Sequence, residues 1–469
     1  MAHGLSAAGI GITGSILTSC GALRTHHQAT VEARRERVAI VGAGVAGLAA
    51  ASALRAVGFD DVVVLEARDR IGGRIWTSNI GGHPIDLGAS WIHGVDGNPI
   101  AGIAADNDIQ ILPTDYDNAS TYFHGGDAAN RSRDHVVTGF WSFARQHPRE
   151  SLHALYDRYV NASNLADEDR QYLAYVLNTA IEHEFAADIG DLSLSSISGG
   201  EDWPGHDALL PGGYSQITEF LASGLDIRTG QAVTRIDYQG TEVVLTSAGG
   251  DRVDAATVVV TVPLGVLKEG VIEFVPDLPA TKHRAIDSLG MGVLNKTCLQ
   301  FDEVFWPEDV ELIGHIGTKP GRWAETVNLF VYTRQPILMM FNAGAYGAQI
   351  EAMSDAQIKG EALATLADMF GSVAPLRNAL ITRWQSDPWS YGSYSYVPVG
   401  SSWIQHEELA KPIDDRVLFA GEATHEDFPA TVHGAYLSGI RAAREVATYL
   451  EQRTRPLGKR TSSSRLLEQ

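Results

Sequence analysis

Residues 37–50, "RVAIVGAGVAGLAA", predict a buried strand, a tight turn and a helix of small residues, in that order. The turn contains the pattern GxGxxG at Gly42, Gly44 and Gly47. Gly42 permits the tight turn, Gly44 lets the backbone approach a pyrophosphate, and Gly47 lets the helix pack closely on the strand. Because the amides at a helix N-terminus favour phosphate groups, these residues predict a dinucleotide site.

The next strand, "VVVLEA", favours this interpretation over the alternative that the glycines serve packing alone. Glu66 ends this strand, nineteen residues after Gly47, where a carboxylate can accept hydrogen bonds from ribose hydroxyls. Arg68 lies two residues further on. The strand–helix–strand unit predicts that a parallel sheet begins here.

The 469 residues are enough for two domains, and strand-rich and helical segments interleave along the chain. Residues 136–190 have helical spacing, whereas residues 225–263 contain short strand-like segments separated by glycine turns. We therefore expect an α/β fold with two discontinuous domains. The predicted boundaries are a leader at 1–36, a nucleotide-binding domain at 37–110, 207–283 and 385–453, a second domain at 111–206 and 284–384, and a flexible tail at 454–469.

The formal charge of −21 argues against a nucleic-acid-binding protein and favours cationic ligands, unless the acidity only aids solubility. The two cysteines, Cys20 and Cys298, exclude a disulfide framework and an all-cysteine metal site. The segment "LTSC" ending at Cys20 resembles a lipoprotein cleavage box, but no Lys or Arg precedes Arg24. We expect a cytoplasmic protein, with an exported lipoprotein anchored at Cys20 as the alternative.

The segment "RDRIGGRIWTS", residues 68–78, contains Gly72, Gly73 and Arg74, which offer bare amides and a forked cation to a pyrophosphate. This turn resembles the second dinucleotide signature of FAD-containing flavoproteins. Through most of residues 37–452 the chain resembles the flavin amine oxidase superfamily, in its polyamine oxidase and lysine-specific demethylase-like branch. The resemblance implies a Rossmann-like FAD-binding domain with a discontinuous α+β substrate-binding domain, the two-domain fold of amine oxidases and p-hydroxybenzoate hydroxylase.

Three further motifs carry the resemblance: "HPIDLGASWIHG" at 83–94, "GLDIRTGQAVTRI" at 224–236 and "VLFAGEATHEDFPATVHGAYLSG" at 417–439. It implies that the first faces the flavin and that the second contacts the adenine end. The third would bind the ribityl or pyrophosphate part and begin a second helix aimed at the flavin. The expected cofactor-binding residues are Gly42, Gly44, Ala46, Gly47, Glu66, Arg68, Gly73, Arg74, Gly88, Ala89, Ser90, Trp91, Val233, Trp389, Gly421, Glu422, Thr431 and Val432.

The segment "LNKTCLQFDEVFWP", residues 294–307, contains Lys296, which resembles the family lysine that is hydrogen-bonded through water to the flavin N5. This implies that its charge assists reoxidation by oxygen, although a lysine on a strand is more often a solvated edge residue. The segment "SDPWSYGSYSYVPVG", residues 386–400, places the family's flavin-facing aromatic at Tyr394. Thr431 stands where monoamine oxidases have a second aromatic residue, which favours a roomier pocket.

The resemblance also places His93 in a substrate tunnel, as a hydrogen-bond partner or proton handler near neutral pH, with a structural histidine as the alternative. Glu184, and less directly Glu182, match tunnel carboxylates that would pair with a distant substrate ammonium, unless they form a solvated helix face. Ser393 stands where monoamine oxidases bond the flavin covalently, so noncovalent FAD is implied and Cys298 is a bystander. The expected catalytic residues are Lys296, Tyr394, Thr431 and His93, and the expected substrate-binding residues are His93, Glu184 and Tyr394.

The reaction that the resemblance implies is hydride transfer from the carbon beside an amine nitrogen to FAD, imine hydrolysis, and reoxidation by O2 with release of hydrogen peroxide. A small-molecule amine, most specifically a polyamine, is the expected partner, without a metal or a nucleic acid. The spacing from Tyr175 to Pro211 leaves no room for the helical insertion by which demethylases bind their partner. The alternatives are a monoamine or secondary-metabolite amine oxidase, an FAD-dependent desaturase or porphyrinogen oxidase, and a noncatalytic flavin-fold protein.

Overall fold

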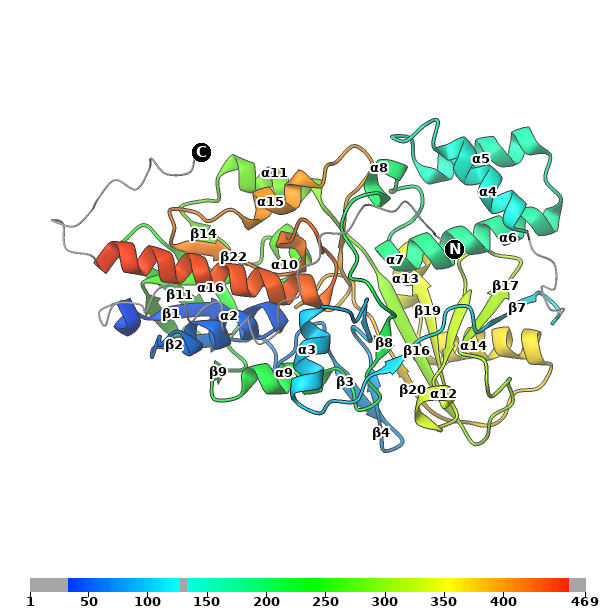
Figure 1. Cartoon of the computed structure of the whole chain (residues 1–469), viewed down its shortest axis with the longest axis horizontal. Coiled ribbons are helices and arrows are strands. Elements are labelled where there is room, and N and C mark those ends of the chain that lie inside the picture. Colours follow the sequence, from blue (N-terminus) through cyan, green and yellow to red (C-terminus); the bar gives the residue numbers. More distant parts are fainter. Residues whose placement is uncertain (1–32, 127–132, 455–469) are drawn as a thin grey trace.

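The computed structural model describes residues 33–126 and 133–454, so Cys20 and all of the predicted tail except its first residue, Thr454, lie outside the described residues. The molecule is elongated, with a parallel sheet in one half and a mainly antiparallel sheet in the other (Figure 1). Helices cover both halves. This arrangement confirms the expected α/β class.

The parallel sheet starts at the glycine motif. Its strands lie in the order β22-β13-β1-β2-β9, and every neighbouring pair is parallel. Four of them are buried along their whole length, as expected for parallel strands that are covered on both faces. Their bounds are β1 (Val38–Val41), β2 (Val62–Leu65), β9 (Asp226–Arg228), β13 (Thr257–Val260) and β22 (Val417–Phe419).

One face of this sheet is covered by two helices from opposite ends of the chain, α2 (Val45–Ala56) and α16 (Val432–Thr454), which lie side by side (Figure 1). Small residues allow this close approach, because a Cβ on Gly439 would lie 2.2 Å from the carbonyl oxygen of Ala46. The helices α3 (Pro99–Asp106) and α9 (Ser215–Ala222) complete this layer. The first and last motifs of the sequence are therefore neighbours in space.

The other face of the parallel sheet carries a four-stranded sheet in the order β12-β11-β10-β14. Three of its strands, β10, β11 and β12, together with β9 and β13 confirm the series of short strands that the sequence predicts in residues 225–263. The strand bounds are β10 (Val233–Asp237), β11 (Val243–Ser247), β12 (Arg252–Ala255) and β14 (Glu273–Val275). The helices beside it are α10 (Leu264–Lys268), α11 (Ala280–Ser288) and α15 (Ile404–Ala410).

The second half is built on a six-stranded sheet in the order β20-β16-β19-β18-β17-β7, antiparallel except for the parallel pair β17 and β7. β16 is buried at seven of its eight positions, which places Lys296 inside the molecule. The strands are β7 (Ala119–Phe123), β16 (Leu294–Phe301), β17 (Leu312–Ile316), β18 (Glu325–Asn328), β19 (Ile337–Ala343) and β20 (Leu376–Ile381). The helices that belong to this part are α12 (Phe330–Thr333), α13 (Gly344–Glu351) and α14 (Asp355–Phe370).

A helical lobe extends from this half and confirms the helical spacing of residues 136–190 (Figure 1). It contains a π-helical turn, η2, a geometry that is common at functional sites. The elements are α4 (Asp134–Ala144), α5 (Leu152–Ser163), α6 (Asp167–Leu177), η2 (Asn178–Glu182), α7 (His183–Phe185) and α8 (Leu194–Ile197).

Three small sheets bring motif residues from distant segments together. β5 pairs with β8 and β15 pairs with β21, so residues 91–92 lie beside 208–209 and residues 290–291 lie beside 395–396. The bounds are β3 (Thr77–Ile80), β4 (His83–Asp86), β5 (Trp91–Ile92), β6 (Leu112–Pro113), β8 (Ala208–Leu209), β15 (Gly290–Met291) and β21 (Ser395–Tyr396), with the short 3-10 turns η1 (Ala33–Arg35) and η3 (Glu422–Thr424). The domain boundaries stay a prediction.

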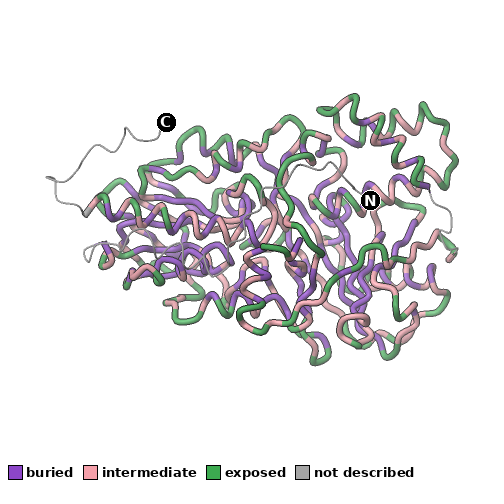
Figure 2. Tube along the Cα trace, in the orientation of Figure 1, coloured by how far each residue is buried: buried purple, intermediate pink, exposed green. Residues whose placement is uncertain are grey.

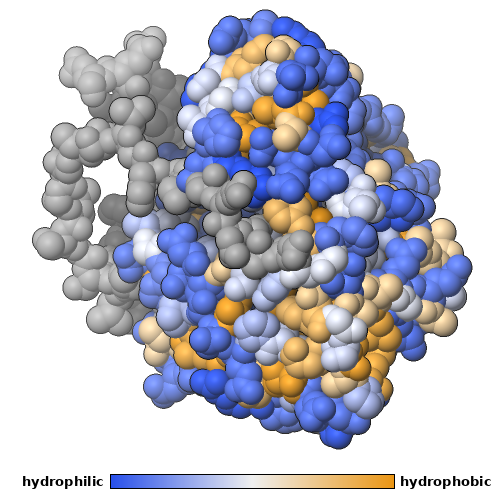
Figure 3. Space-filling view, turned by 90° about the vertical axis from the view of Figure 1, so that its right-hand side faces the viewer, coloured by the Kyte–Doolittle hydropathy of each residue, from blue (hydrophilic) through white to orange (hydrophobic). Residues whose placement is uncertain are grey.

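Burial follows the sheets, and exposed residues concentrate on the outer helices and loops (Figure 2). On the end of the molecule seen in Figure 3, hydrophilic residues dominate the upper lobe and apolar residues are more frequent in the lower half. Within residues 33–126 and 133–454, no helix is both long and apolar enough to cross a bilayer.

Candidate active site

The glycine turn between β1 and α2 contains positions closed by packing and positions that face open space. A Cβ on Gly42 would lie 2.6 Å from Thr261 Oγ1, and a Cβ on Gly47 would lie 2.0 Å from the Gly42 carbonyl oxygen. A Cβ on Gly44 would meet nothing within 4 Å, and one on Gly73 would meet only the Gly44 backbone. Gly44 is the N-cap of α2 and supplies no side-chain cap, so first-turn amides stay available to a ligand. This open cradle fits a pyrophosphate.

The end of β2 lies beside this cradle. Glu66 is buried, and its two carboxylate oxygens accept hydrogen bonds from the amides of Ala43 (2.7 Å) and Arg68 (2.8 Å). Each oxygen keeps a lone pair that a ribose hydroxyl could use. The Arg68 guanidinium forks onto both oxygens of Asp387 at 2.9 Å, and the buried Val233 begins β10 nearby in the same half. Cofactor binding by Glu66, Arg68 and Val233 stays a prediction.

Arg74 and Glu422, both expected at the pyrophosphate, form an ion pair with 2.8 Å between Nη1 and Oε1. The other Glu422 oxygen accepts hydrogen bonds from the Ser395 hydroxyl and from the Ala430 amide at 2.9 Å. Burial opposes ionisation of Glu422, but the charge of Arg74 and these hydrogen bonds hold the pKa of its carboxyl below the usual range. The pair therefore joins two motifs that the sequence separates by 348 residues.

The second predicted helix, α16, begins at Val432, as the motif indicates. Thr431 caps it: its Oγ1 accepts a hydrogen bond from the Gly434 amide and donates one to the Phe428 carbonyl, each at 2.9 Å. The hydroxyl of Thr431 thus donates one hydrogen bond and accepts another within the protein, and both stabilise the N-terminus of α16. A catalytic role of this residue stays a prediction.

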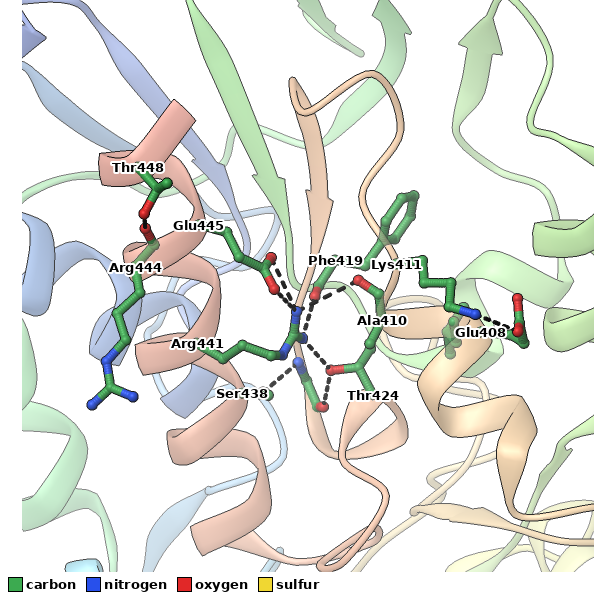
Figure 4. Close-up of polar contacts among 12 residues, drawn as sticks. Glu408, Ala410, Lys411, Phe419, Thr424, Ser438, Arg441, Arg444, Glu445 and Thr448 are labelled. Carbon is green, nitrogen blue, oxygen red and sulfur yellow. Dashed lines mark hydrogen bonds and ion pairs between the residues drawn. The ribbon is translucent and has the colours of Figure 1, made fainter. Parts of the chain in front are cut away.

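Side chains of α16 hold the preceding motif in position (Figure 4). Ser438 Oγ accepts a hydrogen bond from the Gly421 amide at 2.8 Å. Arg441 donates hydrogen bonds to the Phe419 carbonyl (2.7 Å) and to Thr424 Oγ1 (3.2 Å) (Figure 4). A Cβ on Gly421 would meet only one atom, at 4.0 Å, so this segment leaves a second open wall near the glycine cradle.

Lys296 reaches from β16 into the segment that the resemblance places against the flavin. Its Nζ donates hydrogen bonds to the carbonyl oxygens of Asp86 (3.0 Å) and Gly88 and to the Ser90 hydroxyl. Burial lowers the pKa of Lys296 to about 8, while nearby Cys298 and Asp86 favour the charged form. Lys296 is therefore a buried anchor of residues 86–90, and its contact with a flavin through water stays a prediction.

Two tryptophans shape the surroundings of this segment. The Trp91 ring lies 6.1 Å from the ring of Phe341, and Lys296 Nζ lies 6.0 Å from the Trp91 ring. Trp384, which the sequence did not single out, donates from Nε1 to the carbonyl of Leu87 at 3.2 Å. The amide of Ala89 donates a hydrogen bond to the carbonyl of Arg74 at 3.2 Å. Ala46 is buried in the first turn of α2. Trp389 is 37% exposed, and its amide donates a hydrogen bond to Asp387.

Tyr394 lies across from the π-helical turn, and its hydroxyl donates a hydrogen bond to the His183 carbonyl. Burial, with a smaller contribution from the charge of Glu184, raises the pKa of Tyr394 well above its ordinary value, so the phenol stays protonated. The preceding Ser393 accepts a hydrogen bond from the Leu294 amide at 2.8 Å and donates one to its carbonyl at 3.1 Å. This hydroxyl is tied to β16. Cys298 is fully buried, as expected.

His93 follows β5 and forms an ion pair with Asp207, which precedes β8, with 2.8 Å between Nδ1 and Oδ2. The same Asp207 oxygen accepts a hydrogen bond from the Tyr116 hydroxyl at 2.9 Å, and the other accepts one from the Gly94 amide at 2.8 Å. The sequence indicated His93 but neither partner. No recognisable motif surrounds Asp207 or Tyr116, and it is the pairing of β8 with β5 and with β6 that brings them close to His93.

Glu184 and Glu182 have different surroundings. Glu182 is held by the Asn178 side chain (2.7 Å) and by the Ile189 amide (3.0 Å), which assigns it to the π-helical turn. Glu184 is exposed to solvent, yet desolvation raises the pKa of its carboxyl. The charge of His93 acts in the opposite direction and favours the ionised form of Glu184. Of the two, Glu184 is the one that a ligand can reach.

The predicted site residues thus form two groups. The nucleotide group surrounds the glycine cradle and the Arg74–Glu422 pair. The second group is linked through Phe341, whose ring lies 6.1 Å from Trp91, 5.8 Å from Lys296 Nζ and 6.0 Å from His183, the residue that binds Tyr394. Among the described residues, no cluster of three or more His, Cys, Asp or Glu side chains could hold a metal ion.

Known proteins resemble this chain over most of its length. Residues 45–447 match the family described as flavin containing amine oxidoreductase, and residues 2–83 match the pyridine nucleotide-disulphide oxidoreductases. Polyamine oxidase 4 of Oryza sativa subsp. japonica is 36% identical over 432 residues, which cover 87% of this chain and 88% of that protein. Lysine-specific histone demethylase 2 of Homo sapiens is 34% identical over 441 residues, which cover 88% of this chain and 53% of that protein.

A solved structure of a redesigned putrescine oxidase has a TM-score of 0.70 and 21% identity, and the match covers 88% of this chain and 99% of that chain. It confirms the two-domain fold. The family match also confirms FAD as the cofactor, in agreement with the open cradle between Gly44, Gly73 and Gly421. The chain belongs to the flavin-containing amine oxidoreductases.

Proposed function

We propose that the protein oxidises a polyamine, with noncovalent FAD as cofactor and O2 as electron acceptor. The observation that supports this most directly is the charge around His93. Three carboxylates, Asp207, Glu184 and Asp202, act on this solvent-reached side chain. A polyamine carries several ammonium groups, and these three carboxylates attract such positive charges. The similarity to plant polyamine oxidases supports the same substrate class.

When bound, FAD accepts the hydride equivalent from the carbon beside the amine nitrogen. The side chains of the protein then have separate tasks. Tyr394 would place an aromatic face beside the substrate, with its hydroxyl fixed by His183. Glu184 would pair with an ammonium group distant from the oxidised carbon. Lys296, held at residues 86–90, would supply positive charge where oxygen is reduced.

Noncovalent binding of FAD is proposed because Ser393 stands at the position of the flavin-linked cysteine and its hydroxyl is bound to the backbone of Leu294. Acid or heat denaturation of the purified yellow protein should release all of the flavin into the supernatant. Flavin that stays with the precipitated polypeptide would contradict this proposal.

The substrate is tested by mixing the anaerobic holoprotein with single amines and recording the flavin absorbance. Spermine, spermidine and acetylated polyamines should bleach the flavin and, in air, release hydrogen peroxide. An aromatic monoamine and a methylated-lysine peptide are the alternative substrates to compare. Each offers an oxidisable amine but lacks the chain of several amine groups that defines a polyamine. Bleaching by either of these, without bleaching by any polyamine, would overturn the substrate assignment and leave the amine oxidase chemistry intact.

A further inference from the structure

Asp207 contacts three groups around the expected substrate side of the molecule. Its Oδ2 lies 2.8 Å from His93 Nδ1 and accepts the hydroxyl of Tyr116 at 2.9 Å, while Oδ1 accepts the amide of Gly94 at 2.8 Å. Desolvation opposes its ionisation, but the hydrogen bond and charge of His93 and the bonds from Gly94 and Tyr116 hold the pKa of Asp207 below its ordinary value. Asp207 is therefore an ionised carboxylate and can only accept hydrogen bonds.

This fixes which ring nitrogen of His93 carries hydrogen. Because Asp207 cannot donate, the 2.8 Å contact requires a hydrogen on His93 Nδ1. A neutral imidazole has a single N–H, so its Nε2 is then a bare acceptor. The side chain of His93 is 48% exposed, so a ligand can approach it.

The charged and titratable groups that face His93 are Asp207, Glu184, Asp202, Tyr116 and His433. Desolvation lowers the pKa of His93, but the hydrogen bond and charge of Asp207, helped by Glu184 and Asp202, hold it above its ordinary value. His433 is neutral, since burial, with the charges of His93 and His425, lowers its pKa to about 3. Burial raises the pKa of Tyr116, so its hydroxyl stays a donor to Asp207.

We infer that Asp207 is a positioning residue for the amine: it orients His93 through Nδ1 and leaves Nε2 to accept a hydrogen bond from a substrate N–H. Tyr116 supports Asp207 from the other side of the same oxygen. This inference rests on the proposed function for the nature of the ligand. The tautomer and the orientation of His93 follow from the geometry of the protein alone.

The first test uses nuclear magnetic resonance on the FAD-bound protein labelled with 15N-histidine, with His93→Gln to assign the His93 signals. Above the pKa of His93, the wild-type ring should carry its hydrogen on Nδ1. Asp207→Asn should lower the pKa of His93. Asp202→Asn removes a charge from the same neighbourhood without touching the hydrogen bond, so it should lower that pKa less. Hydrogen on Nε2 in the wild type would overturn the inference, as would equal effects of the two variants.

The second test compares pH profiles of kcat/KM for the amine that the wild-type protein oxidises. Asp207→Asn should lower kcat/KM about tenfold and move its acid limb to lower pH, because His93 then loses its proton more readily. Tyr116→Phe keeps the charge of Asp207 and should keep the limb in place. A limb that does not move in Asp207→Asn would contradict the role in catalysis. If no amine is oxidised, the proposed function fails while the resonance experiment still decides the state of His93.

Discussion

The Arg74–Glu422 pair and the His93–Asp207 pair both join distant segments of the chain, but they differ in access to solvent. The side chains of the first pair are 22% and 6% exposed, and those of the second are 48% and 20% exposed. A buried charge without its partner is costly, so the first pair has one stable arrangement. A solvent-reached pair can exchange water for a ligand at small cost. The comparison therefore distinguishes a buried pair beside the nucleotide cradle from a pair that solvent, and hence a ligand, can reach.

The largest effect should come from breaking the buried pair. Arg74→Met leaves Glu422 buried with only hydrogen-bond donors, so the apoprotein should lose about 3–5 kcal/mol of stability. Thermal or urea unfolding measures the loss. His93→Gln, at the solvent-reached pair, is the control and should cost about 1 kcal/mol or less. Equal losses in the two variants would remove the proposed difference between the two pairs.

Lys296 is a buried charge in the second group of predicted site residues, and its substitution tests the proposed role in the reduction of oxygen. Its pKa of about 8 means that it is charged below that pH and loses the charge as the pH rises. Reoxidation by O2 should therefore slow as the pH rises through about 8. Lys296→Met should slow it about 10²-fold and abolish this pH dependence. Stopped-flow absorbance measures the rate, and an unchanged rate in Lys296→Met would refute the assigned role while FAD stays bound.

Two neighbouring glycines separate packing from cofactor binding on the nucleotide side. Gly47→Ala places a Cβ 2.0 Å from the Gly42 carbonyl, so the apoprotein should lose about 1–3 kcal/mol. Gly44 has a φ of −76° and open space at its Cβ, so Gly44→Ala should fold normally and bind FAD more weakly. Unfolding curves and titration with FAD, followed by flavin fluorescence, give the two quantities. Unimpaired FAD binding by Gly44→Ala would show that the cradle lies elsewhere.

The smallest effect is expected for Glu184, whose carboxylate is exposed to solvent. Glu184→Gln should raise KM for a polyamine several-fold, in line with less than about 1 kcal/mol for a solvent-reached ion pair. The value of kcat should change little, and added salt should reduce the difference between the two proteins. Glu182→Gln, which alters a carboxylate bound to Asn178 and Ile189, is the matched control. A larger rise in KM for Glu182→Gln than for Glu184→Gln would indicate that Glu182, and not Glu184, pairs with the substrate ammonium.

The nucleotide side could be predicted from the sequence because its function depends on backbone conformation and on fixed local spacing. Gly42 has a φ of +110°, which favours glycine, and Glu66 follows the next strand at the expected distance. The start of α16 at Val432 was predicted from the resemblance of its motif to the family. Lys296 was singled out through a family resemblance. Its actual partners, the carbonyls of Asp86 and Gly88, leave no trace in sequence because every residue has a carbonyl.

The residues that the sequence did not reveal are those defined by pairing between distant segments. Asp207 becomes a partner of His93 only because β8 pairs with β5. Trp384 binds the Leu87 carbonyl across 297 residues of sequence. Neither residue has a spacing that distinguishes it from an ordinary loop aspartate or a core tryptophan.

By itself, the sequence determined the parallel nucleotide fold, its glycine turn and the family, because these depend on local backbone geometry and on motifs in a fixed order. Only the tertiary structure decided which charges are paired. It joined Arg74 to Glu422, set Lys296 on three acceptors and oriented His93 through Asp207. The physical reason is that ion pairs and buried hydrogen bonds act over a few ångströms in space and do not depend on separation along the chain.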